Sequence, residues 1–199
     1  MEPVQEHISP GRRRPELVRK GLHFLIALAP ALAGFNRILA LALLAAGTLA
    51  YTVMEMLRRQ GKRVPLVSSI TVFASRRRDQ GRFVLGPVTL GAGAFLSLAV
   101  FSPDTAAIAV YALAFGDGTA SLAGKFIGRL RPSFLSGKSL EGSLACFLGV
   151  FISAVLSSGN IHRSIVAAAA ATAAELLPIR DWDNIIIPLV TGAAVQFFS

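Results

Sequence analysis

The sequence predicts an all-α integral membrane protein, a polytopic bundle of about seven transmembrane helices. Hydrophobic residues make up 53% of the chain and charged residues only 16%, whereas a soluble domain carries roughly 25% charged residues. The apolar residues also fall in seven blocks that are nearly free of charge, and a helix needs about 17–20 apolar residues to cross the hydrocarbon. The first, sixth and seventh blocks are marginal in length, so six or eight spans also fit the pattern. The blocks are Leu22–Gly34, Ile38–Met54, Phe83–Phe101, Thr105–Gly124, Gly142–Ser158, Ser164–Leu177 and Ile185–Phe198.

The N-terminal residues are polar. Residues 1–15 contain three prolines, so we expect a polar tail ahead of a single transmembrane domain over residues 16–199. Basic residues followed by an apolar stretch that ends at Ala31–Gly34 also outline a signal peptide. A second apolar block follows almost at once, which favours a retained first span.

Polar connections separate the blocks. The first two blocks are expected to form a hairpin about Asn36–Arg37, and at the end of the second block Glu55 and Arg58 are spaced for an i,i+3 ion pair. The longest connection, Arg58–Arg82, contains apolar runs too short to span, which favours an interfacial helix. Two shorter connections follow, at Arg129–Ser139 and Pro178–Asp183.

The charge distribution predicts an orientation. With a cytoplasmic N-terminus and seven spans, 18 of the 20 basic residues lie on the cytoplasmic side, and Arg37 and Arg163 are the exceptions. The positive-inside rule predicts this asymmetry, and the same surface is suited to anionic lipid headgroups. The formal net charge of +9 does not indicate nucleic-acid binding, because no basic stripe is interleaved with stacking aromatic residues. The single cysteine, Cys146, excludes a disulfide framework.

Four carboxylates lie within or at the predicted cytoplasmic ends of different blocks: Asp117, Glu141, Glu175 and Asp183. An ionisable group inside a span costs about 2.5–3.5 kcal/mol on insertion scales, so each is a functional candidate. All four lie at comparable depth in the predicted topology, beside many Lys and Arg residues. Mg²⁺ prefers one or two carboxylates together with phosphate oxygens, and basic groups balance the remaining phosphate charge. The pattern therefore predicts a site for a metal-bound polyphosphate.

The stretch from Phe115 to Arg129 is the densest in candidate residues. On a helix Asp117, Ser121, Gly124 and Gly128 share one face, and Lys125 and Arg129 mark its cytoplasmic end. Glycines on this face allow either a phosphate or another backbone to come close. The alternative is a Gly-xxx-Gly packing stripe with a buried aspartate that bonds to a neighbouring helix. The sequence leaves both interpretations open.

Two further segments carry polar groups next to a span. Gly137-Lys138-Ser139 is not a P-loop, because Pro132 stands where the motif needs a glycine and no strand precedes it. Lys138 and Ser139 remain suited to phosphate contact, with Glu141 in the first turn of the next span; the alternative for Glu141 is a favourable helix-dipole position.

At the last connection, Asp183 or Asn184 is also explained as a helix cap, and Trp182 as an interfacial anchor. Glu175 lies one turn inside a span, where capping does not explain it.

Taken in order, these motifs resemble the CTP-dependent membrane lipid-alcohol kinases, a family that includes dolichol kinase, phytol kinase and yeast-type diacylglycerol kinase. The central connection departs from the family's Arg-x-x-Glu arrangement with Arg76-Arg77-Arg78-Asp79, which leaves the lipid unassigned. The matching segments cover most of the chain. They are Arg19-Lys20-Gly-Leu-His23, Glu55-Met-Leu-Arg58, Gly116-Asp117-Gly-Thr-Ala-Ser-Leu-Ala-Gly124-Lys125-Phe-Ile-Gly128-Arg129, Lys138-Ser139-Leu-Glu141-Gly142-Ser143, and Glu175 with Asp183-Asn184-Ile-Ile-Ile-Pro188.

The resemblance implies transfer of the γ-phosphate of CTP to the hydroxyl of a membrane lipid alcohol, supported by Mg²⁺. Asp117 and Asp183 are then expected to hold the metal, and Glu141 and Glu175 to support it or to orient the hydroxyl. His23 is expected near the lipid headgroup or its attacking oxygen, with a plain interfacial hydrogen bond as the alternative. The expected nucleotide-binding residues are Lys125, Arg129, Lys138, Ser139, Gly124, Gly128 and Asn184.

Two other functions stay open at this point. The last three motifs also resemble phosphatidate cytidylyltransferases, in which a lipid phosphate attacks the α-phosphorus of CTP. Acidic residues in spans also serve cation or proton transport. Transporters usually place them near the midplane of repeated halves, whereas these acids lie toward one edge and no repeat is visible.

Overall fold

The computed structural model describes residues 20–21, 23–62, 83–132, 135 and 137–198. The predicted N-terminal tail, the predicted interfacial helix between Arg58 and Arg82 and the Arg76–Asp79 segment lie outside these residues. Across the described residues all regular secondary structure is helical, which confirms the all-α prediction. The elements are η1 (Ile26–Leu28), α2 (Ala29–Phe35), α3 (Arg37–Arg59), α5 (Gly86–Val100), α6 (Pro103–Tyr111), η3 (Ala112–Asp117), α7 (Gly118–Phe126), α8 (Leu140–Ser158), α9 (Ile161–Glu175), η5 (Arg180–Trp182) and α10 (Asp183–Phe198).

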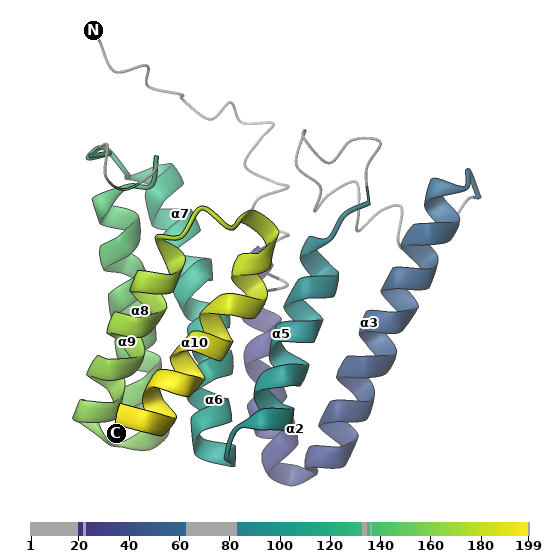
Figure 1. Ribbon diagram of the computed structural model, residues 1–199, viewed down its shortest axis with the longest axis horizontal. Helices are drawn as coiled ribbons and strands as arrows, with labels where there is room; N and C mark the ends of the chain where they lie inside the picture. Colours follow the sequence, from purple (N-terminus) through teal and green to yellow (C-terminus); the bar gives the residue numbers. More distant parts are fainter. Residues whose placement is uncertain (1–19, 22, 63–82, 133–134, 136, 199) are drawn as a thin grey trace, which may run out of the picture.

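Consecutive helices run up and down through the bundle (Figure 1), and the described residues of each of the seven predicted apolar blocks lie mainly in helices. Connections at one end are tight. Asn36 caps α3 by accepting a hydrogen bond from Leu39 N at 3.0 Å, and Asn160 caps α9 through Arg163 N. Gly159 ends α8 with a φ of 65°, a conformation that favours glycine. The end of α3, the start of α5, the end of α7 and the start of α8 lie at the opposite end of the bundle (Figure 1).

Three helices in the described part of the chain are long and apolar enough to cross a membrane: Arg37–Arg59, Pro103–Phe126 and Leu140–Ser158. The apolar helices His23–Phe35, Gly86–Val100 and Asp183–Phe198 are shorter. The structure thus supports a helical membrane protein, and seven crossings remain a prediction.

Two clusters of small and aliphatic side chains form the core. One lies among α8, α9, α10 and the continuous helical stretch that α6, η3 and α7 form. It includes four alanines of α9: Ala167, Ala168, Ala171 and Ala174. The other joins α2, α3, α5 and α6 around Leu90, Ala94 and Leu113. The α3 helix flanks the bundle at its edge (Figure 1), and its outer side chains, such as Leu43 and Leu49, are exposed as expected for a lipid-facing surface.

Helices α5 and α10 touch backbone to backbone. Pro188 inside α10 has no N–H, so the carbonyl of Asn184 four residues earlier lacks its helical donor. That carbonyl lies against Gly93 of α5, at a place where a Cβ atom would overlap it. Asn184 also donates through Nδ2 to Thr89 Oγ1 at 2.9 Å and to Gly86 O at 3.3 Å. A proline, a glycine and a buried amide therefore fix the start of α10 against α5.

Two arginines form hydrogen bonds at helix ends on opposite sides of the molecule, Arg58 at the end of α3 and Arg37 at the end of α5. Arg58 donates to the buried carboxylate of Glu55 at 2.6 and 2.7 Å, which confirms the predicted ion pair, and Val84 N donates to the same carboxylate at 3.1 Å. Glu55 thereby ties the end of α3 to the residues that lead into α5. At the other end, Arg37 donates to the carbonyls of Leu98, Ala99 and Phe101, which lack helical donors at the end of α5.

Candidate active site

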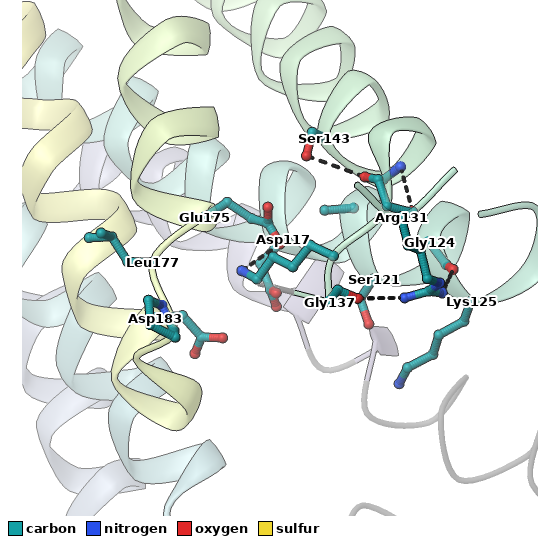
Figure 2. A pocket seen from close by; sticks show the side chains of 15 residues that line it. Asp117, Ser121, Gly124, Lys125, Arg131, Gly137, Ser143, Glu175, Leu177 and Asp183 are labelled. Carbon is teal, nitrogen blue, oxygen red and sulfur yellow. Dashed lines mark hydrogen bonds and ion pairs between the residues drawn. The ribbon is translucent and has the colours of Figure 1, made fainter. Parts of the chain in front are cut away.

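A cavity of about 450 Å³ lies at the end of the bundle where α7 and α9 end and α8 and α10 begin. Its volume is in the range of small-molecule sites, roughly 300–1,000 Å³. Residues from α7, α8, α9, α10 and the connection before α8 line it (Figure 2). The lining consists of Asp117, Ala120, Ser121, Gly124, Lys125, Arg131, Gly137, Lys138, Ser139, Gly142, Ser143, Glu175, Leu177, Pro178 and Asp183.

Three of the four predicted acids meet in this cavity. Asp117 ends η3, Glu175 is the last residue of α9 and Asp183 is the first residue of α10. Figure 2 shows their side chains reaching from three helices toward the same space. The fourth acid, Glu141, is not part of the lining. Its carboxylate accepts hydrogen bonds from Arg129 N at 2.9 Å and Leu130 N at 3.1 Å, so it closes the turn that follows α7 onto the start of α8.

A buried lysine and a buried histidine hold Asp117. Lys20 Nζ lies 2.6 Å from Asp117 Oδ2 and 3.1 Å from the Asp117 carbonyl, and His23 Nδ1 lies 3.2 Å from the same Oδ2. The lysine is only 2% exposed. The sequence placed His23 near the site but gave Lys20 no role of its own. The available signal was the i,i+3 spacing of Lys20 and His23, which puts both on one face of a helix.

Asp117 is the last residue of an irregular part of its helix. Residues Ala112–Asp117 form a π-helical segment, in which each hydrogen bond spans one residue more than in an α-helix. Thr119 Oγ1 lies 2.6 Å from Phe115 O in this segment and 2.8 Å from Ala145 O of α8. π-helical turns are rare and often occur at functional sites. The sequence did not predict this one.

A second ion pair crosses the cavity. Lys138 Nζ, from the connection before α8, lies 2.8 Å from Glu175 Oε1 of α9, and their side chains are 29% and 12% exposed. The other carboxylate oxygen, Glu175 Oε2, is buried and accepts no hydrogen bond from the residues that the structure describes. The pair joins two walls of the cavity that are far apart in the sequence.

The N-terminus of α8 opens into the cavity. Ser139 is its N-cap and accepts a hydrogen bond from Gly142 N at 3.1 Å, and Gly142 and Ser143 line the cavity. A helix N-terminus attracts anions through its free N–H groups and dipole. Lys125 and Lys138 add positive charge to the same region. This wall of the cavity is suited to phosphate groups.

Arg131 was not among the predicted site residues. Its Nη1 donates to Gly137 O and its Nη2 to Gly124 O, both at 2.7 Å. The guanidinium therefore fastens the connection beside Lys138 to the end of α7. Gly137 has a φ of 84°, which only glycine adopts readily. Sequence reasoning could not assign this role, because it depends on how the connection folds back.

The predicted polar face of α7 is present, and its residues divide between the cavity and helix packing. Asp117, Ser121 and Gly124 line the cavity. Gly128 does not; it packs against Ser139 so closely that a Cβ atom would overlap the serine side chain.

Two further predicted nucleotide ligands lie outside the lining. Arg129 is exposed, and Asn184 is buried against α5, where its amide bonds to Gly86 and Thr89.

Comparison with curated proteins finds a match to the probable phytol kinase, chloroplastic, of Triticum aestivum, with 31% identity over 144 residues. The match covers 63% of this chain and 47% of the relative, so the chain spans about half the length of the curated relative it matches. No family model matches the chain, and no solved structure matches it.

Proposed function

We propose that the protein is a CTP-dependent lipid-alcohol kinase, which transfers the γ-phosphate of CTP to the hydroxyl of a membrane polyprenol, phytol-like alcohol or diacylglycerol. The observation that carries this proposal is the convergence of Asp117, Glu175 and Asp183 on a cavity whose facing wall holds Lys125 and Lys138. Phosphoryl transfer needs mainly positioning and neutralisation of charge. An acidic wall and a basic wall on either side of one cavity, at the end of an apolar bundle, meet both requirements.

The triphosphate of the donor is assigned to the basic wall. Its oxygens accept hydrogen bonds from Lys125, Lys138 and the N-terminus of α8, beside the Ser139 cap. Gly124 leaves room for close approach on the α7 side. The choice of CTP over ATP rests on the family resemblance alone.

Mg²⁺ is assigned to Asp117 and Asp183, both in the lining. No three His, Cys, Asp or Glu residues of the described ranges form a metal site by themselves. Two carboxylates suit a magnesium ion, which is usually held by one or two carboxylates plus the phosphates of its nucleotide. When bound, the ion would neutralise charge on the phosphate oxygens. Lys20 and His23 keep the Asp117 carboxylate in its orientation.

Glu175 is assigned to the acceptor. As the phosphates draw Lys138 away, Oε1 of Glu175 becomes available to the hydroxyl of the alcohol. The hydroxyl oxygen then forms a bond to the γ-phosphorus, and its proton passes to the carboxylate. The bond from the γ-phosphorus to the bridging oxygen breaks, and its electron pair leaves with CDP.

The site is assigned to the cytoplasmic face, with the N-terminus on the same side. Arg58 and Arg59 in the last turn of α3 and Lys125 in the last turn of α7 lie at the cavity end of the bundle, and the positive-inside rule supports a cytoplasmic position for this end. Anionic lipid headgroups would contact the same basic end.

Label transfer tests the proposal. Purified protein in detergent is incubated with a panel of lipid alcohols and with CTP that is radiolabelled at either the γ- or the α-phosphate. The expected result is a lipid product labelled from the γ-position only. Label from the α-position would instead indicate a cytidylyltransferase, and no transfer to any lipid would refute the kinase and reopen transport.

A further inference from the structure

The cavity wall is chemically two-sided. Residues from α7, from the connection before α8 and from the start of α8 are small, polar or cationic. Within the described lining, the large apolar side chains are Leu177 and Pro178, and both lie in the turn between α9 and α10. Figure 2 shows Leu177 beside Asp183, across the cavity from Arg131 and Lys125.

The first half of this turn is apolar, and two of its residues are exposed. Leu177 is 47% exposed, Pro178 is also exposed, and Trp182 in η5 is 57% exposed. The turn runs from Glu175 to Asp183, so an acid lies at each end of it. An exposed tryptophan at the end of a membrane helix is typical of the interface between hydrocarbon and water. The turn thus joins the interface to the acidic part of the cavity.

We propose, on the basis of the proposed function, that the hydrocarbon chain of the acceptor alcohol enters over Leu177 and Pro178. The chain contacts this apolar edge, and the hydroxyl reaches the space among Glu175, Asp183 and Asp117. The donor phosphates are kept to the opposite wall, because an apolar surface offers them no hydrogen bonds. Leu177 is therefore a specificity-determining residue that favours alcohols with a long apolar chain.

The experiment compares two acceptors with the same donor: a long-chain isoprenoid alcohol in mixed micelles and a water-soluble five-carbon isoprenoid alcohol. In Leu177→Gln, KM for the long-chain alcohol should rise about 10-fold, the scale of discrimination in an apolar pocket. KM for CTP and kcat/KM for the short alcohol should equal those of the unaltered protein. Leu177→Met should restore the preference for the long chain. Leu156→Gln, at an 81% exposed position near the opposite end of α8, is the matched control and should behave as the unaltered protein.

The outcomes separate two kinds of failure. An unchanged KM for the long chain in Leu177→Gln, or an equal loss with both alcohols, would overturn the entry route while leaving the kinase intact. Absence of transfer by the unaltered protein to either isoprenoid alcohol would overturn this inference, and absence of transfer to every alcohol of the lipid panel would overturn the proposed function as well.

Discussion

Lys138 Nζ lies 2.8 Å from Glu175 Oε1 and joins the connection before α8 to the last residue of α9. Both residues line the cavity, so the ion pair occupies space between the proposed donor and acceptor positions. Under the proposed function, an incoming phosphate competes with Glu175 for the lysine. We therefore expect donor binding and release of the acceptor carboxylate to be coupled through one exchange of partners.

A charge exchange tests this coupling. Lys138→Glu and Glu175→Lys should each lower the thermal unfolding temperature, because each places like charges next to one another. The double variant should recover that temperature, since an ion pair re-forms. Transfer from CTP should remain at least about 100-fold reduced, the scale seen when a group that stabilises transition-state charge is removed. If the double variant recovered turnover as well, the pair would be structural only.

Asp117→Asn is expected to reduce phosphate transfer at least about 100-fold, because a neutral amide is a poor ligand for Mg²⁺. Thermal unfolding in detergent serves as the folding check. Asp104→Asn, at an exposed position at the start of α6, is the control and should leave transfer unchanged. Near-normal turnover of a folded Asp117→Asn protein would remove Asp117 from the mechanism.

Arg131→Lys should raise KM for CTP several-fold while kcat at saturating CTP changes little. A lysine has one nitrogen and cannot reach Gly124 O and Gly137 O together as the guanidinium does. Lys138 is then less firmly positioned for the donor. Arg59→Lys, at an exposed position at the end of α3, is the matched control. An equal fall of kcat and unfolding temperature, without a change in KM, would show that Arg131 acts on stability alone.

Gly93→Ala should destabilise the protein by about 1–3 kcal/mol, as expected when a methyl group is forced into a packed contact. Its Cβ atom would overlap the Asn184 carbonyl and push α5 and α10 apart. Gly47→Ala on α3 has open space around the new atom, and alanine favours a helix more than glycine. The thermal unfolding temperature should therefore fall for Gly93→Ala and stay the same or rise for Gly47→Ala. Equal unfolding temperatures would show that the two helices do not depend on this close contact.

The sequence predicts what depends on composition along a single helix. The described residues of each apolar block lie mainly in helices. The helical spacing of three and four residues correctly grouped Asp117, Ser121 and Gly124 on one face. The meeting of Asp117 with Glu175 and Asp183 followed from topology, since alternating spans bring their charged ends to one side.

Contacts that depend on folded connections were not predictable in this way. Arg131 donates hydrogen bonds to two backbone carbonyls. Because every residue has a backbone carbonyl, no residue type in the sequence marks the partners of this arginine. Glu141 bonds to backbone N–H groups of the preceding connection, a position that its helix-start location does not reveal. Asn184 lies on the side of α10 that packs on α5. Whether a side chain at the start of a helix faces the cavity or a neighbouring helix depends on how the helices pack, which the sequence alone does not show.

Because a π-helical segment ends at Asp117, the direction in which that acid points depends on the number of residues in the helix as well as on the residue type. A helix advances by about 100° per residue, so deleting one residue from Ala112–Gly116 and restoring a regular α-helix would turn everything beyond it by about that angle relative to α6. The aspartate would then face away from Glu175 and Asp183 although the Gly-Asp motif was intact. Alignments of Pro103–Phe126 with other proteins therefore need to allow a gap inside the helix, because an insertion there changes which residue meets the cavity.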